Sequence, residues 1–203
     1  MQQSWAMEKT TEEKTKEILS FSWEEDYQKI EEIYRELLAS DKHESYQILL
    51  LLLSSNDVLH IMKAAEVLAA KGNPRYLPEI KEIRRSSPEH KGLQDYRSTV
   101  DRCIDILENI QRNATCRCPL YESLGSGFSG TFIPDQEKKD GSLEIVKEEL
   151  NKEKYVYEFF CRCTTCGRRW KVTKDIGYHY PTYSWEEITD CDEYRAIFNS
   201  RGL

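Results

Sequence analysis

The sequence predicts an α+β protein, with an all-helical N-terminal half followed by a small β domain. Between Thr10 and Ile110 the apolar residues recur at the spacing of amphipathic helices. Near residue 113 the composition changes, and Gly, Ser, Pro and charged residues become frequent. Further along, Tyr155 to Arg162 alternates between two kinds of side chain, as a β-strand with two different faces does. We therefore predict two domains, at residues 1–112 and 113–203.

A capping box and two apolar patterns predict the first helices. Ser22 and Glu25 match a capping box ahead of a long apolar face, which predicts a helix of about 17 residues. Tyr46 to Leu53 is hydrophobic all round, and this pattern predicts a buried helix at the centre of the N-terminal half.

The segment from Ala64 to Ile80 joins two helices through a Gly-Asn-Pro turn. The first, alanine-rich helix is expected to end at Gly72, and Pro74 starts the next one, where its missing N–H has no intrahelical partner. This junction resembles that of HEAT-type helical repeats, and the resemblance implies a stacked array whose surface binds other molecules. A plain helical bundle is the alternative. In both folds Cys103 is expected on the apolar face of the last long helix.

A long Gly- and Ser-rich loop is expected at residues 122–142. It contains the string G-x-G-x-x-G at Gly125 to Gly130. Pro134 interrupts the helix that must follow such a string in a dinucleotide site, so we expect no nucleotide there. The charged stretch Glu144 to Lys154 fits either a short helix or a strand.

The remaining elements are a β-hairpin and a C-terminal helix. The strand at Tyr155 to Arg162 is expected to pair with a second strand that carries Trp170 and Val172. Ser184 and Asp190, each followed three residues later by Glu, offer two caps for a helix near the C-terminus.

Two tight cysteine clusters are the strongest chemical signal in the chain. Cys163 and Cys166 form C-x-x-C-G, in which glycine permits the positive φ that lets both thiolates reach one ion. Cys116 and Cys118 supply a second close pair. The pattern resembles a zinc ribbon, which implies one structural Zn²⁺ held by these four residues, although the first pair is C-x-C rather than C-x-x-C. Cys161 is a fifth candidate ligand.

Composition and charge limit the functional class. The net charge is −7, which argues against a chain that coats nucleic acid or an anionic membrane and fits a basic partner. The first twenty residues lack a secretory signal, and Ile48 to Leu53 is far shorter than the roughly 20 apolar residues that span a bilayer. We therefore expect a cytoplasmic protein with no membrane association, whose clustered thiols bind metal instead of forming disulfides.

We do not expect an enzyme. The histidines lie scattered along the chain, without metal-ligand or triad spacing: His43, His60, His90 and His179. A catalytic zinc keeps an open position and usually recruits His or Glu, whereas an all-cysteine set is closed and structural. His179, between two tyrosines, supports a hydrolase or transferase as a minor alternative.

Basic residues surround Trp170 near the second cysteine pair: Arg162, Arg168, Arg169, Lys171 and Lys174. Cations interleaved with an aromatic ring are typical of a groove for single-stranded nucleic acid. Alternatively, the cations offset the charge of a zinc-thiolate centre while Trp170 packs in the core. Residues 113–203 hold 13 basic and 15 acidic residues, which favours the second interpretation. A nucleic-acid-binding or transcription-associated factor is therefore the alternative function.

Most of the negative charge lies in the helical half, where 21 acidic residues face 16 basic ones in residues 1–112. Small acidic proteins with helical repeats resemble bacterial immunity proteins. The resemblance implies a non-enzymatic protein that binds and neutralises a cognate, basic toxin. The candidate contact residues are Glu24, Glu25, Asp26, Glu31, Glu32, Tyr178, Tyr180, Tyr183 and Trp185.

Overall fold

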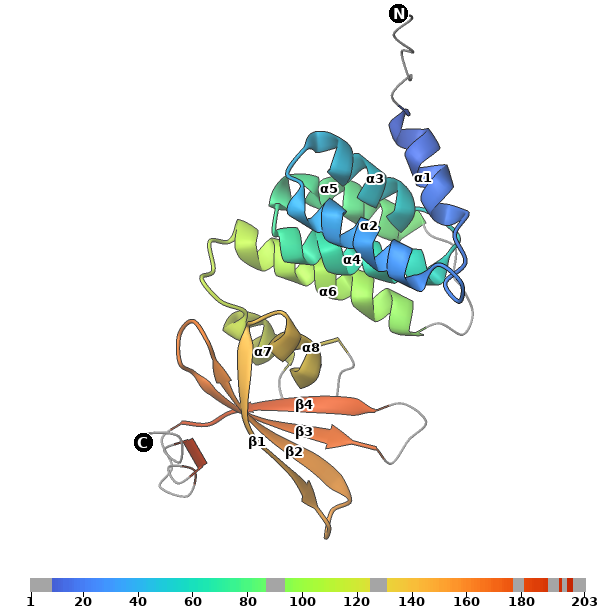
Figure 1. Cartoon of the computed structure of the whole chain (residues 1–203). Helices are drawn as coiled ribbons and strands as arrows, with labels where there is room; N and C mark the ends of the chain where they lie inside the picture. Colours follow the sequence, from blue (N-terminus) through green and yellow to red (C-terminus); the bar gives the residue numbers. More distant parts are fainter. Residues whose placement is uncertain are drawn as a thin grey trace, which may run out of the picture. The chain divides into compact units, whose positions relative to one another are not determined.

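The computed structural model describes residues 9–86, 94–124, 131–176, 181–189, 194, 197 and 198, without the side chains of residues 94–98. The chain divides into two compact units, Met1–Leu107 and Glu108–Leu203. In the described residues the first unit is helical, and the second combines short helices with an antiparallel sheet (Figure 1). The predicted α+β class is therefore confirmed.

The helices of the first unit begin and end at identifiable signals. Their bounds are α1 (Thr11–Leu19), α2 (Tyr27–Ala39), α3 (His43–Leu53), α4 (Val58–Lys71), the 3-10 helix η1 (Pro74–Tyr76), α5 (Leu77–Ser86) and α6 (Gln94–Gln111). Asp57 caps α4 by accepting from the His60 backbone N–H, and Gly72 ends it with φ 62°. Pro74 starts η1, as the Gly-Asn-Pro turn predicts. No helix among the described residues is long and apolar enough to cross a membrane.

The predicted capping box at Ser22 is wrong. The N-cap of α2 is Asp26, and the helix has 13 residues instead of about 17. The backbone N–H of Ser22 donates to the Asp26 carboxylate at 3.1 Å, which closes a turn before the helix starts. A capping box forms instead at α1, between Thr10 and Glu13.

The first unit has an aliphatic core. Its most deeply buried side chains come from five helices and are almost all branched aliphatics: Ile30, Leu49, Leu52, Leu53, Ile61, Leu68, Ile80 and Leu107. Helix α3 contributes three of them, which confirms its predicted central position. A bidentate ion pair from Arg84 to Asp101, at 2.7 and 3.1 Å, joins α5 to α6.

The second unit opens with α7 (Cys118–Leu124) and α8 (Pro134–Lys139). The segment predicted as a loop at 122–142 thus contains a helix, because Pro134 occupies the first turn of α8, where a proline is tolerated. Pro134 and Glu137 are buried, so α8 is part of the folded unit. The glycine-rich string from Gly125 to Gly130 lies outside the described residues.

The sheet has the order β1-β2-β3-β4, and every neighbouring pair is antiparallel. Its strands are β1 (Leu143–Asn151), β2 (Val156–Cys163), β3 (Arg169–Asp175) and β4 (Thr182–Glu187). The hairpin of β2 and β3 is confirmed, and the charged stretch at Glu144 is a strand with a register shift between Ile145 and Lys147.

Ser184 is not the cap of a helix, because it pairs with Thr173 inside the sheet. The string that resembles a cap belongs to β4, in which Tyr183 and Trp185 are buried and the residues between and after them are less so. The second cap, at Asp190, lies outside the described residues.

Aromatic rings fill the core of the second unit. Tyr121 of α7 stacks on Trp185 at 4.3 Å between ring centroids and meets Phe132 and Trp170 edge to face. The Trp185 indole N–H donates to the Phe132 carbonyl at 3.2 Å. These contacts fasten α7, which starts at Cys118, to one face of the sheet.

Candidate metal centre

The fold brings together the four cysteines that the sequence singles out. The sulfur of Cys166 lies 3.6 Å from that of Cys116 and 3.5 Å from that of Cys118, and all four sulfurs, including Cys163, lie within 4.8 Å of one another. In a tetrahedral site with Zn–S bonds of about 2.3 Å, sulfurs are about 3.8 Å apart. The separations are therefore those of thiolates around a single ion.

The second pair sits in the turn between β2 and β3. The Cys163 backbone N–H donates to the Arg168 carbonyl at 2.8 Å, and the Gly167 N–H donates to the Cys163 carbonyl at 3.0 Å. The Cys166 N–H points at the Cys163 sulfur at 3.5 Å. Gly167 has φ 77°, as the C-x-x-C-G pattern predicts. The chain thus folds around the place where an ion would sit.

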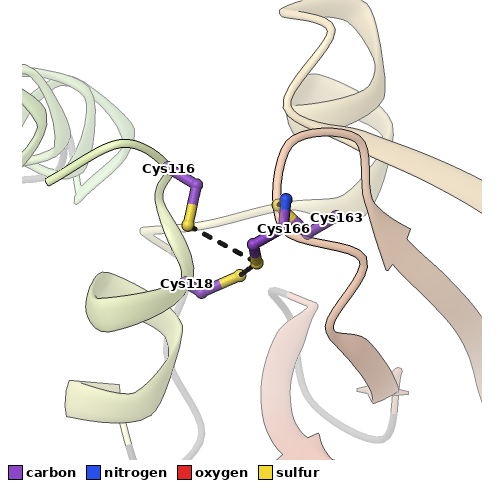
Figure 2. A group of neighbouring side chains, drawn as sticks. All are labelled: Cys116, Cys118, Cys163 and Cys166. Carbon is purple, nitrogen blue, oxygen red and sulfur yellow. Dashed lines mark hydrogen bonds between the residues drawn. The ribbon is translucent and has the colours of Figure 1, made fainter.

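The first pair has a different setting. Cys116 lies in a bend, and Cys118 is the first residue of α7, so this C-x-C is not a strand turn. Figure 2 shows both side chains facing Cys166 from the segment that leads into α7. The Asn109 side-chain amide donates to the Cys116 carbonyl at 2.8 Å and fixes the backbone at this point.

The thiols differ in their readiness to ionise. Burial raises the pKa of Cys116 and of Cys118. The Cys163 and Cys166 thiols raise both further, while the backbone and thiol of Cys118 act in the opposite direction on the pKa of Cys116. Burial also acts on Cys166, but hydrogen bonds from the Arg168 backbone and from the other three thiols lower its pKa overall. A divalent cation would displace the remaining protons, because thiolates and not thiols are the ligands.

Trp170 supplies a test of whether the site fits a metal. Its indole N–H is buried and has no hydrogen-bond partner of adequate geometry. The same N–H nevertheless interacts with the Cys118 sulfur and lowers the pKa of that thiol. A neutral thiol satisfies such a donor poorly, whereas a metal-bound thiolate is a better acceptor. The donor set and this orphaned N–H both fit a bound cation.

Cys161 does not join the group. It is fully buried in β2, and burial raises its pKa to about 12. Cys103 is likewise a core residue of α6, with a pKa raised by burial to about 12. Of the described cysteines, only the four predicted ligands lie together.

The acidic contact candidates lie on and just before α2. Glu24, Glu25 and Glu32 are exposed. Asp26 is partly covered and accepts the Ser22 N–H, and Glu31 forms an ion pair with Lys63 at 2.5 Å. These five residues therefore offer a negative surface in which three carboxylates face solvent.

The aromatic contact candidates that the structure describes are buried. Tyr183 and Trp185 are 4% and 3% exposed, so they are core residues of the sheet and cannot contact a partner in this structure. The alternation of β4 places both side chains inward, so their prediction as contact residues is wrong. Tyr178, Tyr180 and His179 lie outside the described residues.

The basic residues near the second pair are engaged within the unit. Trp170 is 1% exposed and cannot stack on a base. Arg162 pairs with Glu144, Arg168 with Glu122 and Glu187, and Lys171 with Glu158. Among the described residues, the buried Trp170 and its ion-paired neighbours do not provide the exposed ring on which a base stacks in a groove for single-stranded nucleic acid.

Sequence reasoning missed four residues that hold the segment of the first cysteine pair: Asn109, Arg117, Glu137 and Asp140. Arg117 stands between the two cysteines of the first pair and binds Glu137 and Asp140. A charged residue inside C-x-C is a signal that could have pointed to Arg117. Nothing in the local sequence marks Glu137, whose role depends on a partner twenty residues away.

Comparisons of the chain with protein-family models, with curated proteins and with solved structures give no match. The function is therefore argued from the site and its chemistry.

Proposed function

We propose that the second unit is a structural zinc module, in which Cys116, Cys118, Cys163 and Cys166 hold one Zn²⁺. The observation that carries this proposal is the approach of four sulfurs to within 4.8 Å from two segments far apart in the sequence. Four thiolates favour zinc, or iron in an iron–sulfur setting, over oxygen-preferring cations. A closed four-sulfur shell leaves no position for substrate, so the ion would stabilise the fold without performing chemistry.

The protein as a whole would then be a non-enzymatic interaction protein. Its helical unit would act as a HEAT-like binding surface, and the zinc-ribbon-like unit would be the rigid part. The exposed carboxylates Glu24, Glu25 and Glu32 support a basic partner, because an acidic surface accelerates association with a cation-rich one. A cytoplasmic immunity protein that neutralises a basic toxin is the form of this function that we propose.

Metal analysis tests the zinc module. The purified chain should contain one zinc per molecule, and cobalt substitution should give the visible bands of a tetrahedral thiolate site. Cys166→Ser should lose the ion, whereas Cys161→Ser, a matched change at a buried cysteine outside the cluster, should keep it. Iron in place of zinc, or equal metal content in both variants, would contradict the proposal.

Association kinetics test the partner. A protein captured from the source cell should bind more slowly as ionic strength rises, since screening weakens steering. The triple change Glu24→Lys, Glu25→Lys and Glu32→Lys should reduce the association rate further. The control Glu148→Lys with Glu153→Lys reverses charges on exposed residues of the other unit. Salt-independent binding, or equal losses in both variants, would refute an acidic interface in the helical unit.

A further inference from the structure

A buried carboxylate lies beside the first cysteine pair. The Glu137 side chain of α8 has 0% exposure and accepts hydrogen bonds from the Tyr121 hydroxyl at 2.6 Å and from Arg117 Nη1 at 2.9 Å. Arg117 Nη1 also donates to Asp140 at 2.7 Å. The guanidinium thus contacts two carboxylates that lie one helical turn apart, at the C-terminal end of α8.

Arg117 is the middle residue of the C-x-C pair. Its side chain reaches Glu137 and Asp140, whereas those of the two cysteines beside it reach Cys166. The backbone on one side is fixed by Asn109, which is itself buried and donates to the Cys116 carbonyl. The side chains of these three consecutive residues therefore contact two parts of the unit, the turn at Cys166 and the helix α8.

The two cysteine pairs differ in how their backbone orients the thiols. A C-x-x-C-G turn has backbone N–H groups and a glycine that bring its thiols together, as at Cys163 and Cys166. In the C-x-C pair the Cys118 backbone also acts on the Cys116 sulfur, but no glycine closes a turn there, and Cys116 lies in a bend rather than in a helix or strand. Its two sulfurs need another constraint if they are to reach the same ion.

Burial of an ion pair adds little to stability, since desolvation of both charges offsets their attraction. The best-attested reason for retaining such a pair is that it selects one arrangement among several. Residues that orient metal ligands from outside the ligand set have this role in many sites.

We propose that Arg117, held by Glu137 and Asp140, is a positioning residue that fixes Cys116 and Cys118 in the geometry required by the metal. This inference rests on the proposed zinc module and adds to it the means by which the irregular cysteine pair is aligned. Glu137 acts through Arg117, with which it forms an ion pair at 2.9 Å.

The test is zinc affinity of the full chain, measured by competition with a chromophoric chelator. Glu137→Gln preserves the size of the side chain and removes its charge, and it should weaken zinc binding about 10- to 100-fold. Glu158→Gln is the matched control, because Glu158 is also buried in this unit and pairs with Lys171 at 2.9 Å, away from α7 and α8. The control should keep wild-type affinity.

Asp140→Asn covers the case in which Glu137→Gln does not fold. Asp140 is partly exposed, and the change removes the charge of a carboxylate that binds Arg117, so about a tenfold loss of affinity is expected, the lower end of the range for such residues. In Arg117→Met, adding Glu137→Gln should cause no further loss, because Glu137 acts through the guanidinium.

The cobalt spectrum separates positioning from a general loss of stability. A displaced thiolate changes the energies and intensities of the cobalt bands in Glu137→Gln, whereas a merely destabilised fold leaves the bands of the folded fraction unchanged. Wild-type affinity and spectrum in Glu137→Gln and Asp140→Asn would overturn the inference and leave the zinc module standing. A wild-type chain that binds no metal would instead refute the zinc module itself.

Discussion

The helical unit and the sheet unit bury different kinds of side chain. The first is filled by aliphatic residues such as Leu49, Leu52 and Ile61, with no exposure to solvent beyond a few per cent. The second buries aromatic rings together with thiols and a carboxylate, among them Cys118 and Glu137. Aliphatic burial stabilises a fold directly, whereas buried polar groups require partners. We therefore expect the first unit to fold without a ligand, whereas folding of the second unit should depend on a metal.

The largest effect is expected from loss of a metal ligand. Cys163→Ala should remove the ion and unfold the second unit, because structural zinc contributes about 10–16 kcal/mol of binding free energy in small zinc-dependent folds. The first unit should keep its helices. Thermal unfolding followed by circular dichroism, with metal analysis, checks both. Cys161→Ala is the control and should retain the ion. Equal metal content and equal thermal stability in the two variants would contradict a metal-dependent second unit.

A cavity in the aliphatic core should give the next largest effect. Leu52→Ala removes a fully buried side chain of α3 and should lower the free energy of unfolding of the first unit by about 2–5 kcal/mol. Urea unfolding measures the loss. Zinc affinity should be unchanged, and a variant that bound zinc more weakly would show that the units are not independent.

Acid should weaken the first unit through His60. This ring is buried in α4 beside Tyr34, whose hydroxyl lies 2.9 Å from its Nδ1, and burial lowers its pKa below 6.5 although Asp57 acts in the opposite direction. The unfolded chain therefore binds a proton that the folded unit excludes. The contribution of neutral His60 to the free energy of unfolding is fully present above about pH 6.5, and it is lost as the pH falls below that value.

Urea unfolding followed through NMR signals of α4, at pH 7.5 and 5.5 with zinc in excess, measures this dependence. His60→Gln should reduce the difference between the two pH values. A difference equal to that of the wild type would assign the acid effect to other groups.

The smallest effect is expected from the glycine after the second pair. Gly167→Ala meets no neighbouring atom, so its cost comes from φ 77° alone and should be about 1–2 kcal/mol. Part of this should appear as weaker zinc binding. Gly72→Ala, at φ 62° at the end of α4 in the other unit, should cost a similar amount of stability without affecting zinc affinity. Equal zinc affinities in the two variants would mean that this turn does not shape the site.

Local chemistry made some features predictable. C-x-x-C-G fixes a turn by itself, Asp57 and Gly72 delimit α4 by their own side chain and backbone, and the alternation in β2 needs no distant partner. The clustering of Cys116, Cys118, Cys163 and Cys166 could therefore be predicted from spacing, although the geometry of the first pair could not.

Other features depend on contacts between distant residues. Pro134 is compatible with a loop and with a helix start, and the burial of α8 against its partners decides in favour of the helix. The string after Thr182 matches a helix cap, but pairing with β3 makes it a strand and turns Tyr183 and Trp185 inward. Neither outcome is encoded within the segment itself.

Hydrogen exchange of the full chain with and without a strong zinc chelator tests the central claim most directly. The account predicts that chelation abolishes protection of amides in α7, β2 and β3, while amides of α3 and α4 keep theirs. Unchanged protection in the sheet unit after complete removal of metal would contradict it.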